Sequence, residues 1–236
     1  MIPGDQIRQA VRDHYAGRSA EGCCGDAGCC RETAGPELEG FVGPQLGCGS
    51  PLAHAALQVG EAVVDLGSGA GGDVLRAAQQ VGSTGRAIGI DMTPEMIWKA
   101  RENARRLGVP HAEFRLGEIE HLPLPDASAD VVISNCVINL LPDKAVAFRE
   151  AFRALRPGGR LVVSDMVTHG PLPQSIRTDP AAWAACIAGA IDLEDYLASI
   201  RAAGFEQVET VTSTPGAPGR VFSATIRAVK PAVTRR

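Results

Sequence analysis

The chain has 236 residues, a formal net charge of −4 and a sequence pI near 5.8, and 45% of its residues are hydrophobic. This length suits one domain with small additions and allows a large core without disulfide staples. The acidic balance argues against a nucleic-acid-binding protein, which usually presents a basic surface. No apolar run reaches the roughly 18 residues of a membrane span, and the first residues lack the apolar core of a signal peptide. We therefore expect a cytoplasmic protein with no membrane segment.

The first fifty residues fall into two unlike parts. Ile7, Ala10 and Val11 are spaced for one face of a short amphipathic helix over residues 5–16. Residues 17–50 are rich in glycine, alanine and cysteine and indicate a long loop, which is usually functional or disordered. We predict an N-terminal helix and cysteine-rich loop over 1–50, one main domain over 51–230, and a tail over 231–236.

From residue 61 onward, strand-like and helix-like segments alternate. Predicted strands lie at 61–69, 85–92, 112–118, 129–136, 157–166, 206–213 and 219–229. Predicted helices lie at 71–82, 94–108, 142–156 and 180–203. Alternation of this kind predicts an α/β fold with a parallel sheet and helices on both faces. The last two strands follow one another directly and are expected to form a hairpin-like pair at an edge.

A glycine-rich turn follows the first predicted strand and opens the next helix. Gly67 and Gly69 allow a tight turn and close approach of a ligand, and Gly71 relieves crowding at the helix start. Asp91 ends the second strand, where nucleotide-binding folds place a carboxylate for ribose hydroxyls. Asp91 could instead cap the next helix. We favour ribose binding because the glycines and the carboxylate occur together in the expected context.

Cys136 follows Asn135 at the carboxyl end of the fourth predicted strand. Ligands of open α/β sheets bind outside the carboxyl ends of the strands, so Cys136 is expected to face the ligand crevice. A cysteine in a strand is more often a small buried hydrophobic residue. Its position at the end of the strand, rather than in the middle, favours a functional role.

Several motifs together resemble one family, the arsenite S-adenosylmethionine methyltransferases. They are GCGSP, DLGSGAGGD, GIDMTPEM, SNCVINLLPDK, the run SDM…LP…IRTDP…W…C, and VFSATIRAV. The resemblance implies a Rossmann-like, mostly parallel seven-stranded sheet with the last strand antiparallel. It also implies that Cys48, Cys136 and Cys186 bind trivalent arsenic, with Cys186 on a helix after the fifth strand. Thiolates suit arsenic because it is a soft ion.

The resemblance further implies S-adenosylmethionine as methyl donor, a thiol reductant (thioredoxin or glutathione) as co-substrate, and a monomer. It assigns contacts to the methyl donor as follows: Tyr15, Asp65, Gly67, Gly69, Gly71, Asp91, Met92, Glu118, Ile119 and Asn135. No general base is required, because the nucleophile would be an arsenic lone pair. The product could be mono- or dimethylated arsenic.

Other residues leave alternatives open. Cys23 or Cys24, with Cys29 and Cys30, could pass arsenic inward and resolve oxidised thiols, or could belong to a loop without a role in turnover. Trp183 could line the arsenic pocket or belong to the core. Asn139 and Asp143 are expected to be turn and helix-cap residues.

Two rival functions also remain. One is methylation of an organic small molecule with incidental cysteines, and the other is a non-enzymatic arsenic-binding protein.

Overall fold

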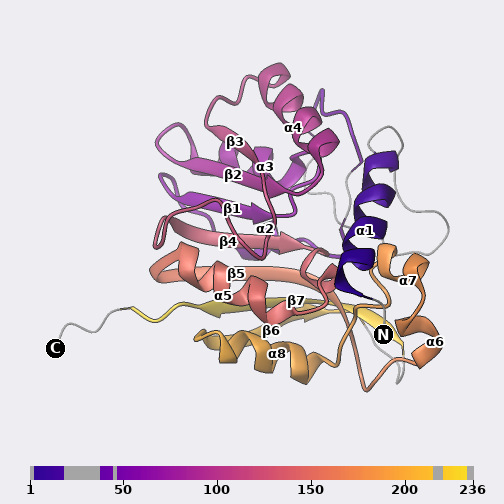
Figure 1. Ribbon diagram of the computed structural model, residues 1–236. Helices are drawn as coiled ribbons and strands as arrows, with labels where there is room; N and C mark the ends of the chain where they lie inside the picture. Colours follow the sequence, from indigo (N-terminus) through magenta and orange to yellow (C-terminus); the bar gives the residue numbers. More distant parts are fainter. Residues whose placement is uncertain (1–2, 19–37, 45–46, 215–219, 233–236) are drawn as a thin grey trace.

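The computed structural model describes residues 3–18, 38–44, 47–214 and 220–232. The predictions for Cys23, Cys24, Cys29 and Cys30 fall outside the described residues. Within them the chain forms the expected α/β architecture, a single twisted sheet covered by helices (Figure 1). The boundaries predicted for the N-terminal part, the main domain and the tail stay predictions.

The sheet has seven strands in the order β3-β2-β1-β4-β5-β7-β6. Their bounds are β1 Ala62–Leu66, β2 Arg86–Asp91, β3 Ala112–Leu116, β4 Ala129–Asn135, β5 Leu155–Thr168, β6 Glu206–Ser213 and β7 Val221–Val229. Neighbouring strands from β3 to β5 pair in parallel, whereas β7 is antiparallel to both β5 and β6. The predicted fold class is confirmed, including the antiparallel last strand and the final pair, with β6 at the edge.

Helices cover both faces of the sheet. The longer ones are α1 Gly4–Arg18, α3 Gly72–Val81, α4 Pro94–Arg106, α5 Lys144–Ala154 and α8 Leu193–Ala202. The short ones are α2 Pro51–His54, η1 Ile138–Leu140, α6 Gln174–Arg177 and α7 Pro180–Ala184. Apolar residues of α3 and α4 form one core with β1, β2 and β4. Residues of α5 and α8 form a second core on the other face, so the sheet is buried on both sides.

The prediction of one helix over residues 180–203 is wrong. It is replaced by α7 and α8, separated by an irregular segment over 185–192. Backbone N–H groups of Ile187 and Ala188 both turn back to the carbonyl oxygen of Ala182, which ends α7. Asp192 then caps α8 by accepting a hydrogen bond from the N–H of Glu194 at 2.9 Å. The alanine-rich sequence favours a longer helix locally, but the contacts described below override that preference.

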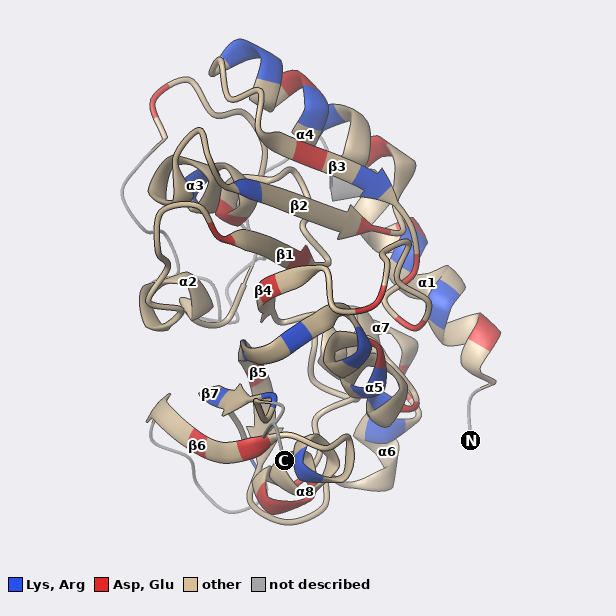
Figure 2. Cartoon of the chain, turned by 90° about the vertical axis from the view of Figure 1, so that its left-hand side faces the viewer, with Lys and Arg blue, Asp and Glu red and all other residues tan. Residues whose placement is uncertain are grey.

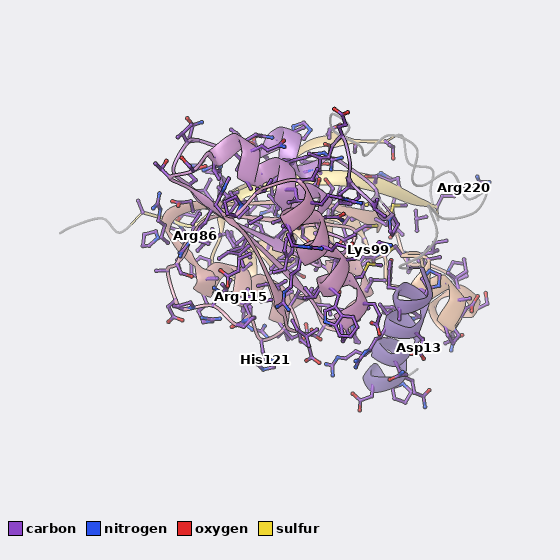
Figure 3. All side chains as sticks on the ribbon, turned by 90° about the horizontal axis from the view of Figure 1, so that it is seen from above. Asp13, Arg86, Lys99, Arg115, His121 and Arg220 are labelled. Carbon is purple, nitrogen blue, oxygen red and sulfur yellow. The ribbon has the colours of Figure 1, made fainter. Side chains whose placement is uncertain are left out.

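A third apolar cluster lies at the carboxyl ends of the strands, beneath α1 and α7. It joins Ile7 and Val11 of α1 with Met166, Trp183, Cys48 and Cys186. Cys136 packs against this cluster. Figure 3 shows α1 on the outside of the molecule. Asp13 on α1 and His121 in the loop after β3 are both exposed to solvent. Helix α1 therefore forms one wall over this end of the sheet. Among the described residues, no helix is both long enough and apolar enough to cross a bilayer.

Candidate active site

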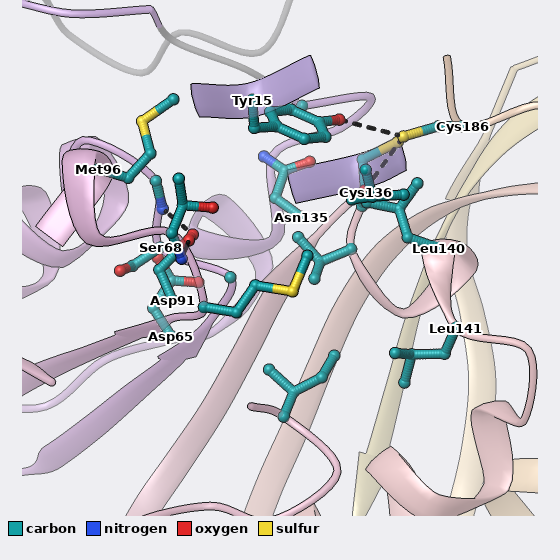
Figure 4. Close-up of a pocket in the computed structure, with 18 of the residues that line it drawn as sticks. Tyr15, Asp65, Ser68, Asp91, Met96, Asn135, Cys136, Leu140, Leu141 and Cys186 are labelled. Carbon is teal, nitrogen blue, oxygen red and sulfur yellow. Dashed lines mark hydrogen bonds between the residues drawn. The ribbon is translucent and has the colours of Figure 1, made fainter. Parts of the chain in front are cut away.

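A deep pocket opens at the carboxyl ends of β1, β2 and β4, where parallel α/β sheets usually bind ligands. One side is formed by the glycine turn after β1, and the other by Cys48, Cys136 and Cys186. Figure 4 shows the carboxylates of Asp65 and Asp91 grouped on one side and Cys136 and Cys186 on the other, with Asn135 between them. The pocket thus has an acidic end and a thiol end.

Three carboxylates define the acidic end: Asp65, Asp73 and Asp91. Figure 2 shows acidic positions at the carboxyl ends of β1 and β2, where Asp65 and Asp91 lie. Burial, followed by the charges of Asp73 and Asp91, raises the pKa of Asp65 well above its usual range. Burial also raises the pKa of Asp73 and of Asp91. Like charges this close are unfavourable by themselves, so this end is suited to a ligand that carries positive charge and hydroxyl groups.

Asp91 also holds the glycine turn. One of its carboxylate oxygens accepts the N–H of Gly69 at 2.9 Å, and the other accepts the N–H of Thr93 at 2.8 Å. The second bond is to Thr93, which is itself the N-cap of α4, so the alternative that Asp91 caps this helix is wrong. Because Asp91 also lines the pocket, the same carboxylate is available to a ligand. Its assignment to ribose stays a prediction.

The three glycines of the turn differ in what a side chain at each position would meet. Gly67 has φ +72°, and a Cβ there would overlap the side chain of Val137. Gly69 also lines the pocket, and a Cβ there would meet nothing within 4 Å. Gly71 is not among the pocket residues; a Cβ there would lie 2.7 Å from the ring of Phe114. Its described contacts therefore concern packing of α3 against β3, in contrast to the donor contact that we predicted.

The loop after β3 borders the same pocket. Glu118 and Ile119 line it, as does Met92 after β2. Glu120 is 11% exposed at its side chain and pairs with Arg8 of α1, with Nη2 and Oε1 3.2 Å apart. The residues predicted to contact a methyl donor therefore surround one cavity, except Gly71. Arg8 and Glu120 were not singled out as a pair by the sequence, because their 112-residue separation hides it.

The thiols of Cys48, Cys136 and Cys186 come together although they lie far apart in the sequence. The Sγ atoms of Cys48 and Cys136 and a carboxylate oxygen of Asp165 all lie within 4.8 Å of one another. The Sγ of Cys186 donates a hydrogen bond to the carbonyl oxygen of Cys136 at 3.3 Å. All three are free thiols. Cys186 is outside this group but lines the same end of the pocket, so sulfur atoms from three separate segments border one space that suits a soft ion.

Two of these cysteines have strained backbone. Cys136 has φ +61° and Cys186 has φ +59°, in the left-handed region that non-glycine residues rarely adopt. Such strain costs on the order of 1–3 kcal/mol per residue and persists only where the surroundings impose it. Cys186 lies two residues beyond Ala184, the last residue of α7, so the expectation that it lies on a helix is wrong. The left-handed turn after α7 directs its thiol toward Cys136.

Asn135 holds the segment that carries Cys48. Its Oδ1 accepts the N–H of Cys48 at 3.0 Å and that of Gly49 at 3.3 Å, and its Nδ2 donates to the carbonyl oxygen of Gly49 at 2.9 Å. The hydroxyl of Ser223 on β7 donates to the carbonyl oxygen of Cys48. Asn135 lines the pocket as well, so it borders the predicted donor site and fixes a predicted arsenic ligand.

Two of the thiols, those of Cys48 and Cys136, are held in their neutral form. Hydrogen bonds to Cys186 and Cys48, together with burial, raise the pKa of Cys136 well above its usual value. A hydrogen bond from Cys136 lowers the pKa of Cys48, but burial and the charge of Asp165 outweigh it, and the net pKa is raised. A charged thiolate is therefore disfavoured here until a ligand replaces the proton.

A buried polar group behind the thiols was missed by the sequence analysis. Asp165 of β5 accepts the hydroxyl of Tyr196 at 3.0 Å, and Lys144 of α5 is also buried. Burial, opposed by Lys144, raises the pKa of Asp165 to about 6, and burial lowers the pKa of Lys144 to about 8. Only the occurrence of Lys144 and Asp165 inside motifs SNCVINLLPDK and SDM could have pointed to them.

The contacts in the structure bear on the roles considered above for single residues. Tyr15 lines the pocket, and its hydroxyl lies 3.7 Å from the Sγ of Cys186 within hydrogen-bonding geometry. Trp183 packs in the cluster with Cys48 and Cys186 but is not a pocket residue. Asp143 caps α5 through the N–H of Ala145, as expected. Asn139 is fully buried in η1 and binds another loop, so a simple turn role is wrong.

The model of the family described as methyltransferase domain matches residues 57–209. The chain is 47% identical to the arsenite methyltransferase of Halobacterium salinarum over 229 residues, which covers 87% of this chain and 59% of that protein. It is 37% identical to the arsenite methyltransferase of Homo sapiens over 160 residues, covering 64% of this chain and 43% of that protein. The chain thus spans about half the length of the curated relatives it matches.

A solved structure gives a similar result. The crystal structure of CrArsM, an arsenic (III) S-adenosylmethionine methyltransferase from Chlamydomonas reinhardtii, matches with a TM-score of 0.65 and 31% identity. The match covers 98% of this chain and 75% of that one. The similarity therefore extends beyond the matched domain to the N-terminal part of the chain.

Proposed function

The chain belongs to the methyltransferase domain family, and from this we propose that it methylates trivalent arsenic with S-adenosylmethionine as methyl donor. The observation that carries the proposal is the convergence of Cys48, Cys136 and Cys186 at one end of a pocket whose other end is a glycine turn with carboxylates. Trivalent arsenic is soft and prefers sulfur ligands, and three sulfur atoms satisfy its valence. The named relatives are consistent with this substrate.

The acidic end suits the positive charge and the hydroxyl groups of S-adenosylmethionine. When bound, this donor would supply an electrophilic methyl group on a positively charged sulfonium. An arsenic lone pair can attack the methyl carbon while the carbon–sulfur bond breaks and S-adenosylhomocysteine leaves. Asp65 offers a buried carboxylate to its ammonium group, beside the half-buried Asp73 that pairs with Arg76, and Asp91 offers oxygen atoms to its ribose hydroxyls. Glu118 and Ile119 would contact its adenine. Burial and, after it, repulsion from Asp73 and Asp91 raise the pKa of Asp65, and a positive ligand would offset both effects.

The neutral thiols of Cys48 and Cys136 suit arsenous acid as the form that enters. Three S–H and three As–O bonds break, three As–S bonds form, and the three protons leave with the three hydroxyl groups as water. No net charge is created, which matters because Cys48 and Cys136 are buried or half-buried beside Asp165. A divalent cation with three thiolates would instead leave a negative charge in the same place.

The catalytic contribution of the protein is mainly alignment. Both reactants would bind in one pocket, and holding reacting groups in line can lower a barrier by roughly 7–11 kcal/mol. Transfer of a methyl group to the arsenic lone pair raises its formal oxidation state by two. A trivalent product therefore needs two electrons, which we assign to thioredoxin or glutathione. These reductants operate in the cytosol, where we place the reaction as arsenic detoxification, with mono- or dimethylated arsenic as product.

The test is direct. The protein is incubated with arsenite, glutathione and S-adenosylmethionine, and the arsenic species are separated by chromatography. We expect methylated arsenicals from the native chain and from Glu113→Gln, an exposed carboxylate at the far side of the sheet. Cys136→Ser and Cys186→Ser should produce none, because we take these two thiols as the minimum clamp that holds arsenic in every methylation step.

Two outcomes would contradict the proposal. Unchanged arsenite with methylation of an organic acceptor would favour the rival methyltransferase. Arsenite binding without any binding of S-adenosylmethionine would favour a non-enzymatic arsenic-binding protein.

A further inference from the structure

Asn139 connects the two strained cysteine segments. It lies in η1, three residues after Cys136, and its side chain is fully buried. Its Nδ2 donates a hydrogen bond to the carbonyl oxygen of Cys186, 2.5 Å away. Cys186 is 47 residues further along the chain, so this bond is a tertiary contact and not part of a local turn.

The backbone of Asn139 is fixed on both sides. Its N–H donates to Asp165 Oδ2 at 2.8 Å, and its carbonyl oxygen accepts from Nζ of Lys144 at 3.2 Å. The same Asp165 oxygen also accepts the hydroxyl of Tyr196. Asn139 therefore cannot move toward or away from Cys186 without breaking bonds to β5 and α5.

The segment after Cys186 packs directly on Asn139. A Cβ at Gly189 would overlap the carbonyl oxygen of Asn139 and would lie 2.7 Å from the ring of Trp183. It would also lie 3.0 Å from Oδ1 of Asn139. This position excludes any side chain, so the turn that carries Cys186 rests on a fixed support.

The side-chain amide of Asn139 carries an energetic cost, an unpaired buried oxygen, which its hydrogen bond to Cys186 offsets. Oδ1 of Asn139 is buried and has no hydrogen-bond partner. An apolar residue of the same shape would avoid that unpaired acceptor, but would leave the carbonyl oxygen of Cys186 without this donor. The amide is therefore of use because it holds Cys186, whose left-handed backbone has to be imposed by its surroundings.

We propose that Asn139 is a positioning residue for the third sulfur ligand of arsenic. This inference rests on the proposed function. Asn139 touches neither substrate; it acts through Cys186, whose thiol it keeps beside Cys136. Without the amide, Cys48 and Cys136 still face one another, because Asn135 and Ser164 hold their backbones. Arsenic is then bound by two protein sulfurs instead of three.

The test substitutes Asn139→Leu, which keeps the approximate shape and removes both the donor and the unpaired acceptor. X-ray absorption spectroscopy of the arsenite complex, without added thiol, counts the sulfur neighbours of arsenic. We expect three in the native protein and two in the variant. Arsenite affinity and the kcat of the first methylation should each fall at least about tenfold, as expected for loss of a buried hydrogen bond. The KM for S-adenosylmethionine should stay within about twofold.

Tyr196→Phe is the matched control. It removes one hydrogen bond from the same Asp165 oxygen but leaves the bond from Asn139 to Cys186. We expect a similar loss of thermal stability with three sulfur neighbours retained. If Asn139→Leu does not fold, Asn139→Ala is measured in the same way, because it also removes the donor.

Three sulfur neighbours and native arsenite affinity in a folded Asn139 variant would overturn the inference while leaving the proposed function intact. Two sulfur neighbours in Tyr196→Phe would also overturn it, since the effect would then be general to the buried group. A native protein that does not bind arsenite would instead refute the proposed function.

Discussion

Asp91→Asn is the substitution that most sharply separates the two ends of the pocket. Asp91 uses one carboxylate oxygen for the N–H of Gly69 and the other for the N–H of Thr93. Asparagine has the same shape but only one oxygen. Whichever way the amide turns, one of the two backbone N–H groups then faces an NH₂ group instead of an acceptor.

The expected size of the effect follows from these bonds. A hydrogen bond to a charged group contributes about 1.5–3 kcal/mol, and the variant loses one of the two. Gly69 and Asp91 both line the pocket, so the loss falls on the surface that would bind the methyl donor. Affinity for the donor should therefore fall about 10- to 100-fold. Arsenite affinity should stay within about twofold, because the bonds that fix the thiols involve other residues.

Isothermal titration calorimetry with S-adenosylhomocysteine, a non-reactive analogue of the donor, measures the first affinity, and arsenite titration measures the second. Glu113→Gln is the control, since Glu113 is an exposed carboxylate whose partner is Arg115. Native affinity for the analogue in Asp91→Asn would refute the role given to Asp91. An equal loss of both affinities in a folded variant would refute the division of the pocket into two ends.

Three further predictions concern single positions. Cys48→Ser should reduce the first methylation more than the second, because methylated arsenic has one fewer valence to fill; equal losses in a time course of both products would contradict this. Gly67→Ala should lower the free energy of unfolding more than Gly158→Ala, since both glycines have positive φ but only Gly67 has a side chain, that of Val137, in the way. Urea unfolding of both variants makes this comparison, and equal losses would argue against the overlap. The pKa of Asp165 is raised to about 6 from 3.8, so its ionisation opposes folding as pH rises between these values. The shift corresponds to about 3 kcal/mol. Asp165→Asn should flatten the fall in stability over this range, and an unchanged pH profile in urea unfolding would contradict the assignment.

The sheet was predictable because each of its strands carries a strong local signal. Val63 and Val64 precede the glycine turn, and Val131, Val132 and Ile133 form a continuous apolar run, the pattern of strands buried on both faces. Asp65, Asp91, Glu118 and Cys136 each lie at or just after the end of such a strand. Since the ends of parallel strands meet at one edge, locating the strands also brought these residues together.

The supports of the thiols could not be predicted, because they depend on contacts between distant segments. Cys186 lies in an alanine-rich stretch whose local preference is helical, yet the turn after α7 follows from packing on Asn139. Asparagine is a residue type common in turns, and the sequence around Asn139 does not indicate a partner 47 residues away. Asp165 lies within an apolar strand, where only the structure shows Tyr196 and Lys144 facing it.

The separation of Cys48, Cys136 and Cys186 along the chain has a consequence for folding. The unfolded polypeptide cannot present these sulfurs at a common point, so a ligand that bridges all three binds the folded form far better than the unfolded one. By mass action, such a ligand at 100 times its dissociation constant stabilises the fold by about 2.7 kcal/mol. The melting temperature is therefore expected to report occupancy of the thiol end, and a ligand bound to all three sulfurs should also protect the protein against heat and proteolysis.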